Sequence, residues 1–121
     1  LTIFEASKDK SVSSHYCLNA ILPRDGRINR DEVVAELNHA GIGTSVHYPK
    51  AVPLTAFYAE KYGHLTGQFP VAEWLAKQTI SLPVGPHLNP GDARKIGLTL
   101  KEVLYKISPQ SISIPKRDRK I

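Results

Sequence analysis

The first half of the chain has the hydrophobic pattern of a strand followed by a helix. Residues 15–23 are apolar enough to form a strand that is buried on at least one face. A polar turn follows, and Asn29 can then cap a helix, with Glu32 three positions later in a capping-box arrangement. The apolar residues of this helix recur at helical spacing and predict one buried face: Val33, Val34, Leu37 and Ala40.

A glycine and a β-branched run come directly after this helix. Gly41 is expected to end the helix in the left-handed conformation. The next residues predict a strand over 42–48, because its β-branched members alternate: Ile42, Thr44 and Val46. Pro49 prevents further regular pairing, so His47 and Tyr48 stand at the end of this strand. They can offer polar groups to a ligand there; the alternative is that both are ordinary half-buried packing residues.

The second half of the chain predicts three helices and one brief strand. Proline and glycine signals place a short helix over residues 53–62, stopped by Gly63. Further helices are expected to start at Pro70 and after Asn89, with a strand over residues 80–84 between them. The helix predicted over residues 53–62 has an aromatic face that is expected to pack on the sheet: Phe57, Tyr58 and Tyr62.

These elements predict a protein of the α/β (α+β) class with one core. A chain of 121 residues is long enough for one domain but not for two cores. We expect a small sheet of three or four strands with helices packed mainly on one face. The predicted domain covers residues 15–104. A lead-in segment precedes it over residues 1–14, and a basic tail over residues 105–121 is expected to be extended or mobile.

Composition limits the class of protein further. The chain is 41% apolar and 22% charged, which is typical of an ordinary globular protein. It has no apolar run of the roughly 20 residues that a membrane span requires, and no basic-then-apolar leader at its N-terminus. The single cysteine, Cys17, cannot form an intrachain disulfide. A reducing cytoplasm is therefore the expected location, and a buried, inert thiol is the expected state of Cys17.

The net charge of +5 favours anionic partners only weakly. Much of the excess lies near the C-terminal end, and without that segment the charge is close to balanced: Lys106, Lys116, Arg117, Arg119 and Lys120. A nucleic-acid-binding tail is the least favoured function. The basic stretch contains an aspartate and has no interleaved aromatic residues on which bases could stack.

The residues taken by themselves contain no self-contained catalytic constellation. There is no Gly-rich phosphate loop, no CxxC pair, and no Ser or Cys in a nucleophile-elbow context. The histidines lack metal-ligand spacing: His15, His39, His47, His64 and His87. The pattern therefore indicates a globular domain with one suggestive strand end.

Several motifs nevertheless occur together in an order and spacing that resemble a known family. They are Arg30-Asp31-Glu32-Val33, the run GIGTSVHYP over residues 41–49, Phe69-Pro70-Val71-Ala72-Glu73, Ser81-Leu82-Pro83-Val84 and Asn89-Pro90. This set resembles the C-terminal part of the DegT/DnrJ/EryC1/StrS aminotransferases over residues 15–104. The resemblance implies a pyridoxal-phosphate (PLP) enzyme of fold type I. Such enzymes act on nucleotide-linked keto sugars or related ring ketones, usually as homodimers with sites at the subunit interface.

The resemblance covers only the small C-terminal domain, which in this family helps to close the active site over the substrate. The Schiff-base lysine, the acid that pairs with the pyridine nitrogen and the phosphate loop belong to the large domain. No lysine of this chain stands in a matching context, so we expect no catalytic residue, no bound cofactor and no transamination by this chain alone. The implied partners are the large domain, a nucleotide-sugar substrate and a second copy in a homodimer; neither nucleic acid nor a membrane is expected.

The resemblance also assigns site residues. Its GI…HYP motif puts His47 and Tyr48 at the mouth of the active site, where they can donate hydrogen bonds to substrate hydroxyls or phosphates. Gly41 and Gly43 would shape the turn into that strand. The family often carries a second histidine shortly afterwards, in a Pro-Leu-His segment. This chain has Lys50-Ala51-Val52-Pro53-Leu54 there, and Lys50 can serve as an anion contact instead.

A second function of a different class stays open. The chain can be a stand-alone binding or dimerisation module that has kept the fold of this domain and lost the reaction. Such a module would pair through an exposed sheet edge or through the face once covered by the large domain, because apolar surface left by removing a neighbour tends to find a new partner.

Overall fold

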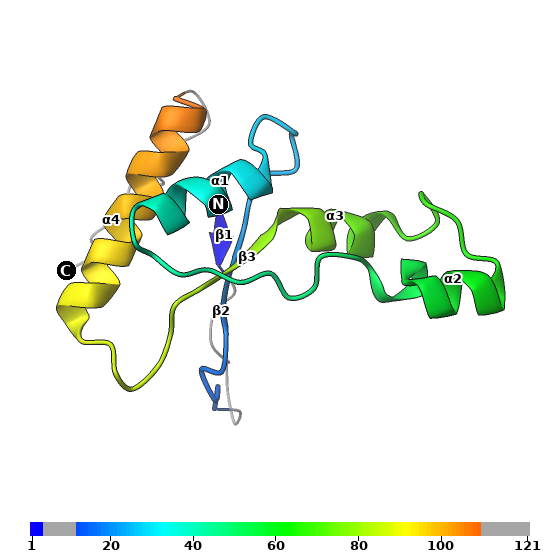
Figure 1. Cartoon of the computed structure of the whole chain (residues 1–121), viewed down its shortest axis with the longest axis horizontal. Coiled ribbons are helices and arrows are strands. Elements are labelled where there is room, and N and C mark those ends of the chain that lie inside the picture. The colour runs from blue at the N-terminus through cyan, green and yellow to red at the C-terminus, as the bar shows by residue number, and fades with distance from the viewer. Residues whose placement is uncertain (4–11, 110–121) are drawn as a thin grey trace, which may run out of the picture.

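The computed structural model describes residues 1–3 and 12–109. Within those residues the chain forms one small sheet and four α-helices, and Figure 1 shows α2 and α3 reaching away from the sheet. The elements in chain order are β1 (Thr2–Ile3), β2 (Leu18–Ile21), α1 (Arg30–His39), a 3₁₀ helix (Val52–Leu54), α2 (Ala56–Tyr62), α3 (Pro70–Gln78), β3 (Thr79–Leu82) and α4 (Pro90–Ile107).

The strands form one antiparallel sheet in the order β1-β2-β3. In the register of β2 and β3, Ala20 lies opposite Ile80, and Asn19 lies opposite Ser81. Because successive side chains of a strand point to opposite faces, Ala20 and Ile80 share one face while Asn19 and Ser81 share the other. The sheet therefore has one apolar face and one face that carries polar groups at its centre.

The apolar face is covered by α1 and α4, which also pack against each other. Their buried side chains join those of β2 and β3 in one core cluster, whose largest fully buried members are Leu22, Val33, Leu37 and Ile80. Burying a side chain of this size stabilises the folded chain by about 1.5–3 kcal/mol. The predicted fold class, a small three-stranded sheet with helices packed on one face, is confirmed.

Both of these helices begin where the sequence predicts, because an asparagine satisfies their first backbone amides. The Asn29 Oδ1 atom accepts hydrogen bonds from the backbone N–H of Asp31 at 2.8 Å and of Glu32 at 3.4 Å. In α4 the capping box is complete. Asn89 Oδ1 accepts from the Asp92 N–H at 3.0 Å, and Asp92 Oδ2 accepts from the Asn89 N–H at 2.9 Å.

The predicted strand over residues 42–48 is wrong. Within that segment a single residue, Ser45, forms a β-bridge, and its partner is Ser81 of β3. The reason lies at the end of α1, where the amide of Ile42 donates to the carbonyl of Leu37 at 2.9 Å. This bond closes the helix and turns the chain, so the Ile42 side chain enters the core with 4% of its surface exposed instead of continuing a ladder.

The remaining boundaries differ in smaller ways. The strand predicted over 15–23 narrows to β2, and the strand predicted over 80–84 is β3, shifted toward the N-terminus. β1 was not predicted, because a strand of two residues has no period to detect. The helix predicted over 53–62 is divided into the 3₁₀ helix and α2. α4 continues to Ile107, and the tail beyond residue 109 lies outside the described residues.

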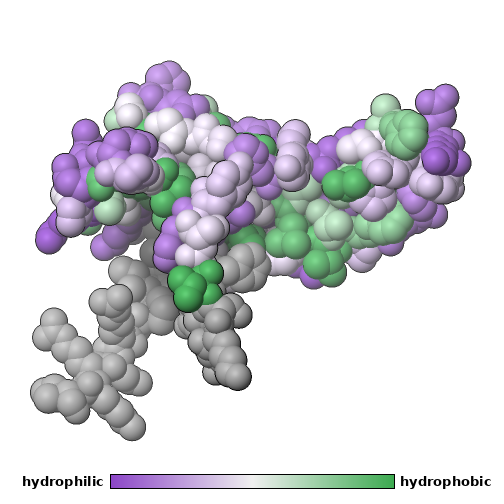
Figure 2. All heavy atoms as spheres, turned by 90° about the horizontal axis from the view of Figure 1, so that it is seen from below, coloured by the Kyte–Doolittle hydropathy of each residue, from purple (hydrophilic) through white to green (hydrophobic). Residues whose placement is uncertain are grey.

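α2 and α3 form an arm that projects from the sheet, as Figure 1 shows. A second and smaller cluster of buried residues holds the arm together, with Phe69 and Ala72 packed against Ala51, Leu54 and Ala76. Figure 2 shows hydrophobic residues gathered on one side of this arm. The large apolar residues exposed along it are Val52, Phe57, Tyr58, Tyr62, Leu65 and Val71.

The aromatic face of α2 does not pack on the sheet, and the expectation that it would is wrong. Because the arm projects, these rings contact one another instead: Phe57 meets Tyr58 edge-on at 5.2 Å, and Tyr58 stacks on Tyr62 at 6.1 Å between centroids. The Lys61 ammonium lies over two of them, 5.4 Å from the Phe57 centroid and 5.3 Å from that of Tyr62. The three aromatic residues are between 40% and 62% exposed.

Candidate functional site

The segment over residues 41–50 connects α1 to the arm and carries the residues that the sequence singled out. It begins at Gly41, whose φ of +77° lies in the left-handed region that residues other than glycine rarely adopt. The Gly41 amide donates to the carbonyl of Asn38 at 3.0 Å, next to the bond from Ile42 to Leu37. Together these two bonds form a Schellman motif, which fixes the direction in which the segment leaves the helix.

Gly43 differs from Gly41. Its φ lies outside the left-handed region, and a Cβ atom added there would meet no atom within 4 Å among the described residues. Neither backbone conformation nor packing therefore requires a glycine at position 43. Of the two glycines assigned to this turn, Gly41 is the one whose conformation the turn depends on.

Ser45 anchors the middle of the segment to the sheet. Its amide donates to the Ser81 carbonyl at 3.1 Å, and the Ser81 amide donates back to the Ser45 carbonyl at 2.8 Å. Two residues that exchange both bonds form a hydrogen-bonded pair of the antiparallel kind. The segment is thus held at one point beside β3.

The polar face of the sheet continues this attachment. The Ser81 hydroxyl donates to Asn19 Oδ1 at 2.7 Å, and the half-buried Cys17 thiol lies 3.4 Å from the same oxygen and 3.5 Å from Ser81 Oγ. The expectation of a buried Cys17 is thus met only in part. Because Ser81 lies between the segment and β2, it links Ser45 to Asn19.

His47 and Tyr48 lie two and three residues beyond this anchor, and both are exposed rather than half-buried, Tyr48 by 70%. Their rings meet edge-on with centroids 5.9 Å apart. The Nε2 atom of His47 lies 3.0 Å from the Ser45 hydroxyl oxygen. Lys50 follows, also exposed. The structure therefore brings the predicted histidine and tyrosine together at the surface.

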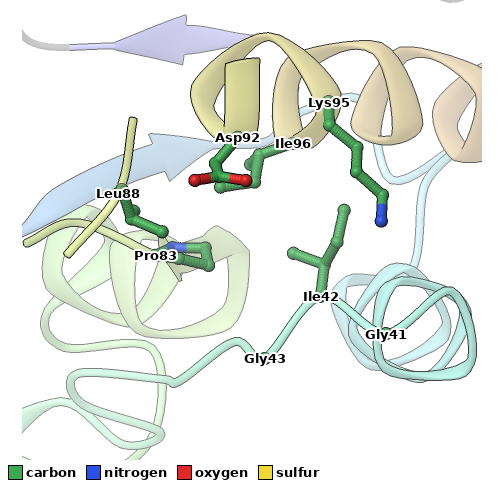
Figure 3. A pocket seen from close by; sticks show the side chains of 8 residues that line it. All are labelled: Gly41, Ile42, Gly43, Pro83, Leu88, Asp92, Lys95 and Ile96. Carbon is green, nitrogen blue, oxygen red and sulfur yellow. The ribbon is translucent and has the colours of Figure 1, made fainter. Parts of the chain in front are cut away.

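A pocket of about 340 Å³ opens beside the start of the same segment. Figure 3 shows it between the end of α1 and the start of α4, with Ile42 on one side and the α4 side chains of Asp92, Lys95 and Ile96 on the other. It is lined by Gly41, Ile42, Gly43, Pro83, Leu88, Asp92, Lys95 and Ile96. The pocket includes the two glycines of the predicted site but not His47, Tyr48 or Lys50.

The described residues do not fit a cofactor held through a Schiff base. That chemistry needs a lysine inside an enclosed site, and every lysine that the structure describes is exposed to solvent: Lys50, Lys61, Lys77, Lys95, Lys101 and Lys106. Residues 1–3 and 12–109 also contain no group of His, Cys, Asp and Glu side chains that could hold a metal ion. This part of the chain can therefore contribute hydrogen-bonding groups to a site.

Comparison with known proteins identifies the family. The sequence model of the DegT/DnrJ/EryC1/StrS aminotransferase family matches residues 1–101. The chain belongs to this family. The family is PLP-dependent, and the resemblance drawn from the motifs is confirmed.

Individual relatives agree with this assignment. The chain is 47% identical over 73 residues to the erythromycin biosynthesis sensory transduction protein EryC1 of Saccharopolyspora erythraea, covering 60% of this chain and 20% of that protein. It is 42% identical over 67 residues to the dTDP-3-amino-3,4,6-trideoxy-alpha-D-glucose transaminase of Streptomyces venezuelae, covering 55% of this chain and 17% of the relative. The chain thus spans about a fifth of the length of the curated relatives that it matches.

Solved structures show the same partial coverage. Spr1654 from Streptococcus pneumoniae, in its PMP form, superposes with a TM-score of 0.71 at 29% identity, over 83% of this chain and 25% of that one. Streptomyces venezuelae DesV, in complex with a ketimine intermediate, superposes with a TM-score of 0.60 at 35% identity, over 72% of this chain and 22% of that one. The fold described above therefore corresponds to the C-terminal region of a sugar aminotransferase.

Sequence reasoning missed three residues that organise the segment: Asn19, Ser45 and Ser81. A signal for Ser45 was present, since it stands two positions before His47, and alternate residues of an extended segment lie on the same side. No local signal exists for Asn19 and Ser81, because their contact depends on how β2 and β3 pair. None of the helices in the described ranges is long and apolar enough to cross a membrane.

Proposed function

We propose that this chain forms the small C-terminal domain of a PLP-dependent aminotransferase that acts on a nucleotide-linked keto sugar, and that it closes the active site over the substrate. The reacting cofactor and its lysine would be held by a large domain outside this chain. The single observation that supports this role is the exposed His47–Tyr48 pair, which is held at the surface by the attachment of Ser45 to β3.

The chemistry of these side chains suits a substrate rich in oxygen atoms. The imidazole of His47 and the phenol of Tyr48 can each donate a hydrogen bond, and the Lys50 ammonium can approach an anion. Phosphate and hydroxyl oxygens of a nucleotide-linked sugar are acceptors of this kind. In this proposal the chain binds and orients the substrate and excludes water, and it has no group that reacts.

The test uses a full-length enzyme that contains this chain, with His47→Ala compared to the unchanged enzyme. Removing a hydrogen bond to a charged group costs about 1.5–3 kcal/mol, so we expect kcat/KM for the nucleotide sugar to fall roughly 10- to 150-fold. His39→Ala is the matched control, because His39 is also exposed but lies on α1. Unchanged kinetics in His47→Ala, with circular dichroism showing an intact fold, would exclude the proposed contact.

The proposal that the reactive centre lies outside this chain has its own test. Purified chain is titrated with PLP, trapped with borohydride and mapped by mass spectrometry. We expect weak labelling scattered over the exposed lysines. Saturable labelling of a single residue, with Lys50 the one to watch, would show that a cofactor site exists in this chain and that the proposed division of labour is wrong.

The exposed apolar surface of the arm supports the proposed partners. Val52, Phe57 and Val71 are each more than half exposed, and an apolar surface of this kind favours contact with another protein surface. We propose that the large domain, or a second subunit of a homodimer, covers it. A stand-alone dimerisation module would use the same surface. Comparing the turnover of the full-length enzyme with that of its His47→Ala variant separates an aminotransferase domain from a dimerisation module. A module that has lost the reaction shows no turnover in either protein.

A further inference from the structure

We propose that Ser45 is a positioning residue for His47. Its hydroxyl fixes the tautomer of the neutral His47 ring, with the proton on Nδ1, so that the segment presents the Nδ1–H group to an acceptor oxygen of the substrate. The substrate part of this inference rests on the proposed function, whereas the contact between Ser45 and His47 belongs to this chain alone.

Ser45 is fixed in position by a backbone attachment to the sheet. Both backbone bonds between Ser45 and Ser81, at 3.1 and 2.8 Å, tie Ser45 to the central part of β3. Ser81 is itself 3% exposed and held from the other side by Asn19. Because the Ser45 backbone is fixed, its hydroxyl also has a restricted position.

The side chains of Ser45 and His47 contact each other. The Ser45 Oγ atom is 3.0 Å from His47 Nε2. This distance is that of a hydrogen bond. Within the described ranges the structure gives the Ser45 hydroxyl no other hydrogen-bond partner.

The contact with Ser45 decides which His47 nitrogen carries the proton. A neutral imidazole has one N–H and one nitrogen with a free lone pair, and the bond made by one nitrogen decides where the proton sits. A serine hydroxyl can donate or accept, but the imidazole nitrogen is the stronger base, so the favoured bond is O–H to nitrogen. Ser45 then donates to Nε2, and the proton of His47 lies on Nδ1, free to donate elsewhere.

The consequence is that one defined ring nitrogen of His47 is the donor. Free histidine side chains favour the opposite tautomer, with the proton on Nε2. Ser45 would therefore turn the donor nitrogen of His47 away from itself and fix the ring, which reduces the rotamer freedom lost when substrate binds. A lone exposed histidine without this contact would sample both tautomers and several rotamers.

The experiment records long-range ¹H–¹⁵N spectra of the histidine rings in the ¹⁵N-labelled chain. The pH is set to about 8.5, roughly two units above an ordinary histidine pKa of about 6.5. The His47 signals are identified by their loss in His47→Gln. We expect Nε2 at the shift of an unprotonated nitrogen and Nδ1 at that of a protonated one, and we expect Ser45→Ala to move both toward the opposite tautomer.

Two further variants complete the test. Ser45→Thr keeps the hydroxyl and should keep the wild-type signature. Thr44→Ala removes the neighbouring hydroxyl, which faces Asn38 at 3.4 Å rather than His47, and should change nothing. The inference is overturned if Ser45→Ala leaves the His47 shifts unchanged. A loss of the signature in Ser45→Thr or in Thr44→Ala would overturn it as well, because the backbone and not the Ser45 hydroxyl would then set the tautomer.

These outcomes are independent of turnover. If the signature behaves as expected while His47→Ala leaves the full-length enzyme unaffected, the proposed function fails and the Ser45 contact stands. If both hold, Ser45→Ala in the full-length enzyme should lower kcat/KM less than His47→Ala does, and Ser45→Thr should restore it.

Discussion

The two glycines at the start of the candidate segment allow a matched test of what shapes its turn. Gly41→Ala places a Cβ atom at a φ of +77°, and Gly43→Ala places one at a position outside the left-handed region. Neither new Cβ would meet an atom within 4 Å in the described part of the chain. Any difference in stability between the two variants therefore reports the backbone conformation and not a steric clash.

The magnitudes follow from two terms. An alanine forced into the left-handed region costs about 1–2 kcal/mol, while replacing a glycine restricts the unfolded chain and returns about 0.4–1 kcal/mol. Gly41→Ala carries both terms and should lower the free energy of unfolding by about 1 kcal/mol. Gly43→Ala carries only the second and should raise it by about 0.4–1 kcal/mol. The unfolded-state term cancels between them, so they should differ by about 1–2 kcal/mol.

The assay is urea unfolding followed by far-ultraviolet circular dichroism, with the slope m the same in all three proteins. Equal free energies of unfolding in the two variants, within about 0.3 kcal/mol, would refute the assignment of the turn to the conformation of Gly41. A lower stability of Gly43→Ala than of Gly41→Ala would refute it more directly.

Three further predictions concern other contacts. Arg30→Ala should lower the free energy of unfolding by about 1.5–3 kcal/mol. The nearly buried Arg30 guanidinium donates to the carbonyls of Ala76 and Thr79, where α3 meets β3, at 3.2 and 3.4 Å. Arg27→Ala, at a more exposed arginine, is the control in the same urea titration. Asn89→Ala should cost about 1 kcal/mol through loss of the α4 capping box, visible as a lower thermal midpoint, and a midpoint equal to that of the wild type would contradict the capping role. The hydrogen bond from Lys106, together with its charge, lowers the pKa of Glu36 below its ordinary value of 4.5. The resulting stabilisation is present above that value and is lost as the pH falls through the lowered pKa. Lys106→Gln should therefore return the Glu36 pKa toward 4.5 in an NMR titration and be less stable than the wild type at pH 7 but not in acid.

Local signals in the sequence predicted the helices well. Asn29, Asn89 and Gly63 cap helices in the structure as expected, because a cap depends on a few consecutive residues and their own backbone amides and carbonyls. The family motifs likewise located the fold. These features do not depend on contacts with residues distant in the sequence.

Features that depend on a distant partner were predicted less well. The alternation of Ile42, Thr44 and Val46 suits a strand, but a strand also needs a neighbour along its length, and here the Schellman turn leaves only Ser45 in register with β3. The aromatic residues of α2 have the spacing of a buried face, yet nothing in that spacing tells that the arm leaves the sheet. The exposure of His47 could not be read from the sequence for the same reason.

The small size of the arm's buried cluster affects how the chain loses structure. Ala51, Leu54 and Ala76 bury far less apolar surface than the cluster between the sheet, α1 and α4. A region with few buried contacts opens at a lower free energy than the whole domain. The amides of α2 should therefore exchange with solvent through subglobal opening while β2, β3 and α1 remain protected. α3 of the arm continues directly into β3 of the sheet. The chain is then two cooperative units joined inside one continuous stretch of backbone, with the candidate segment attached to the unit that opens last.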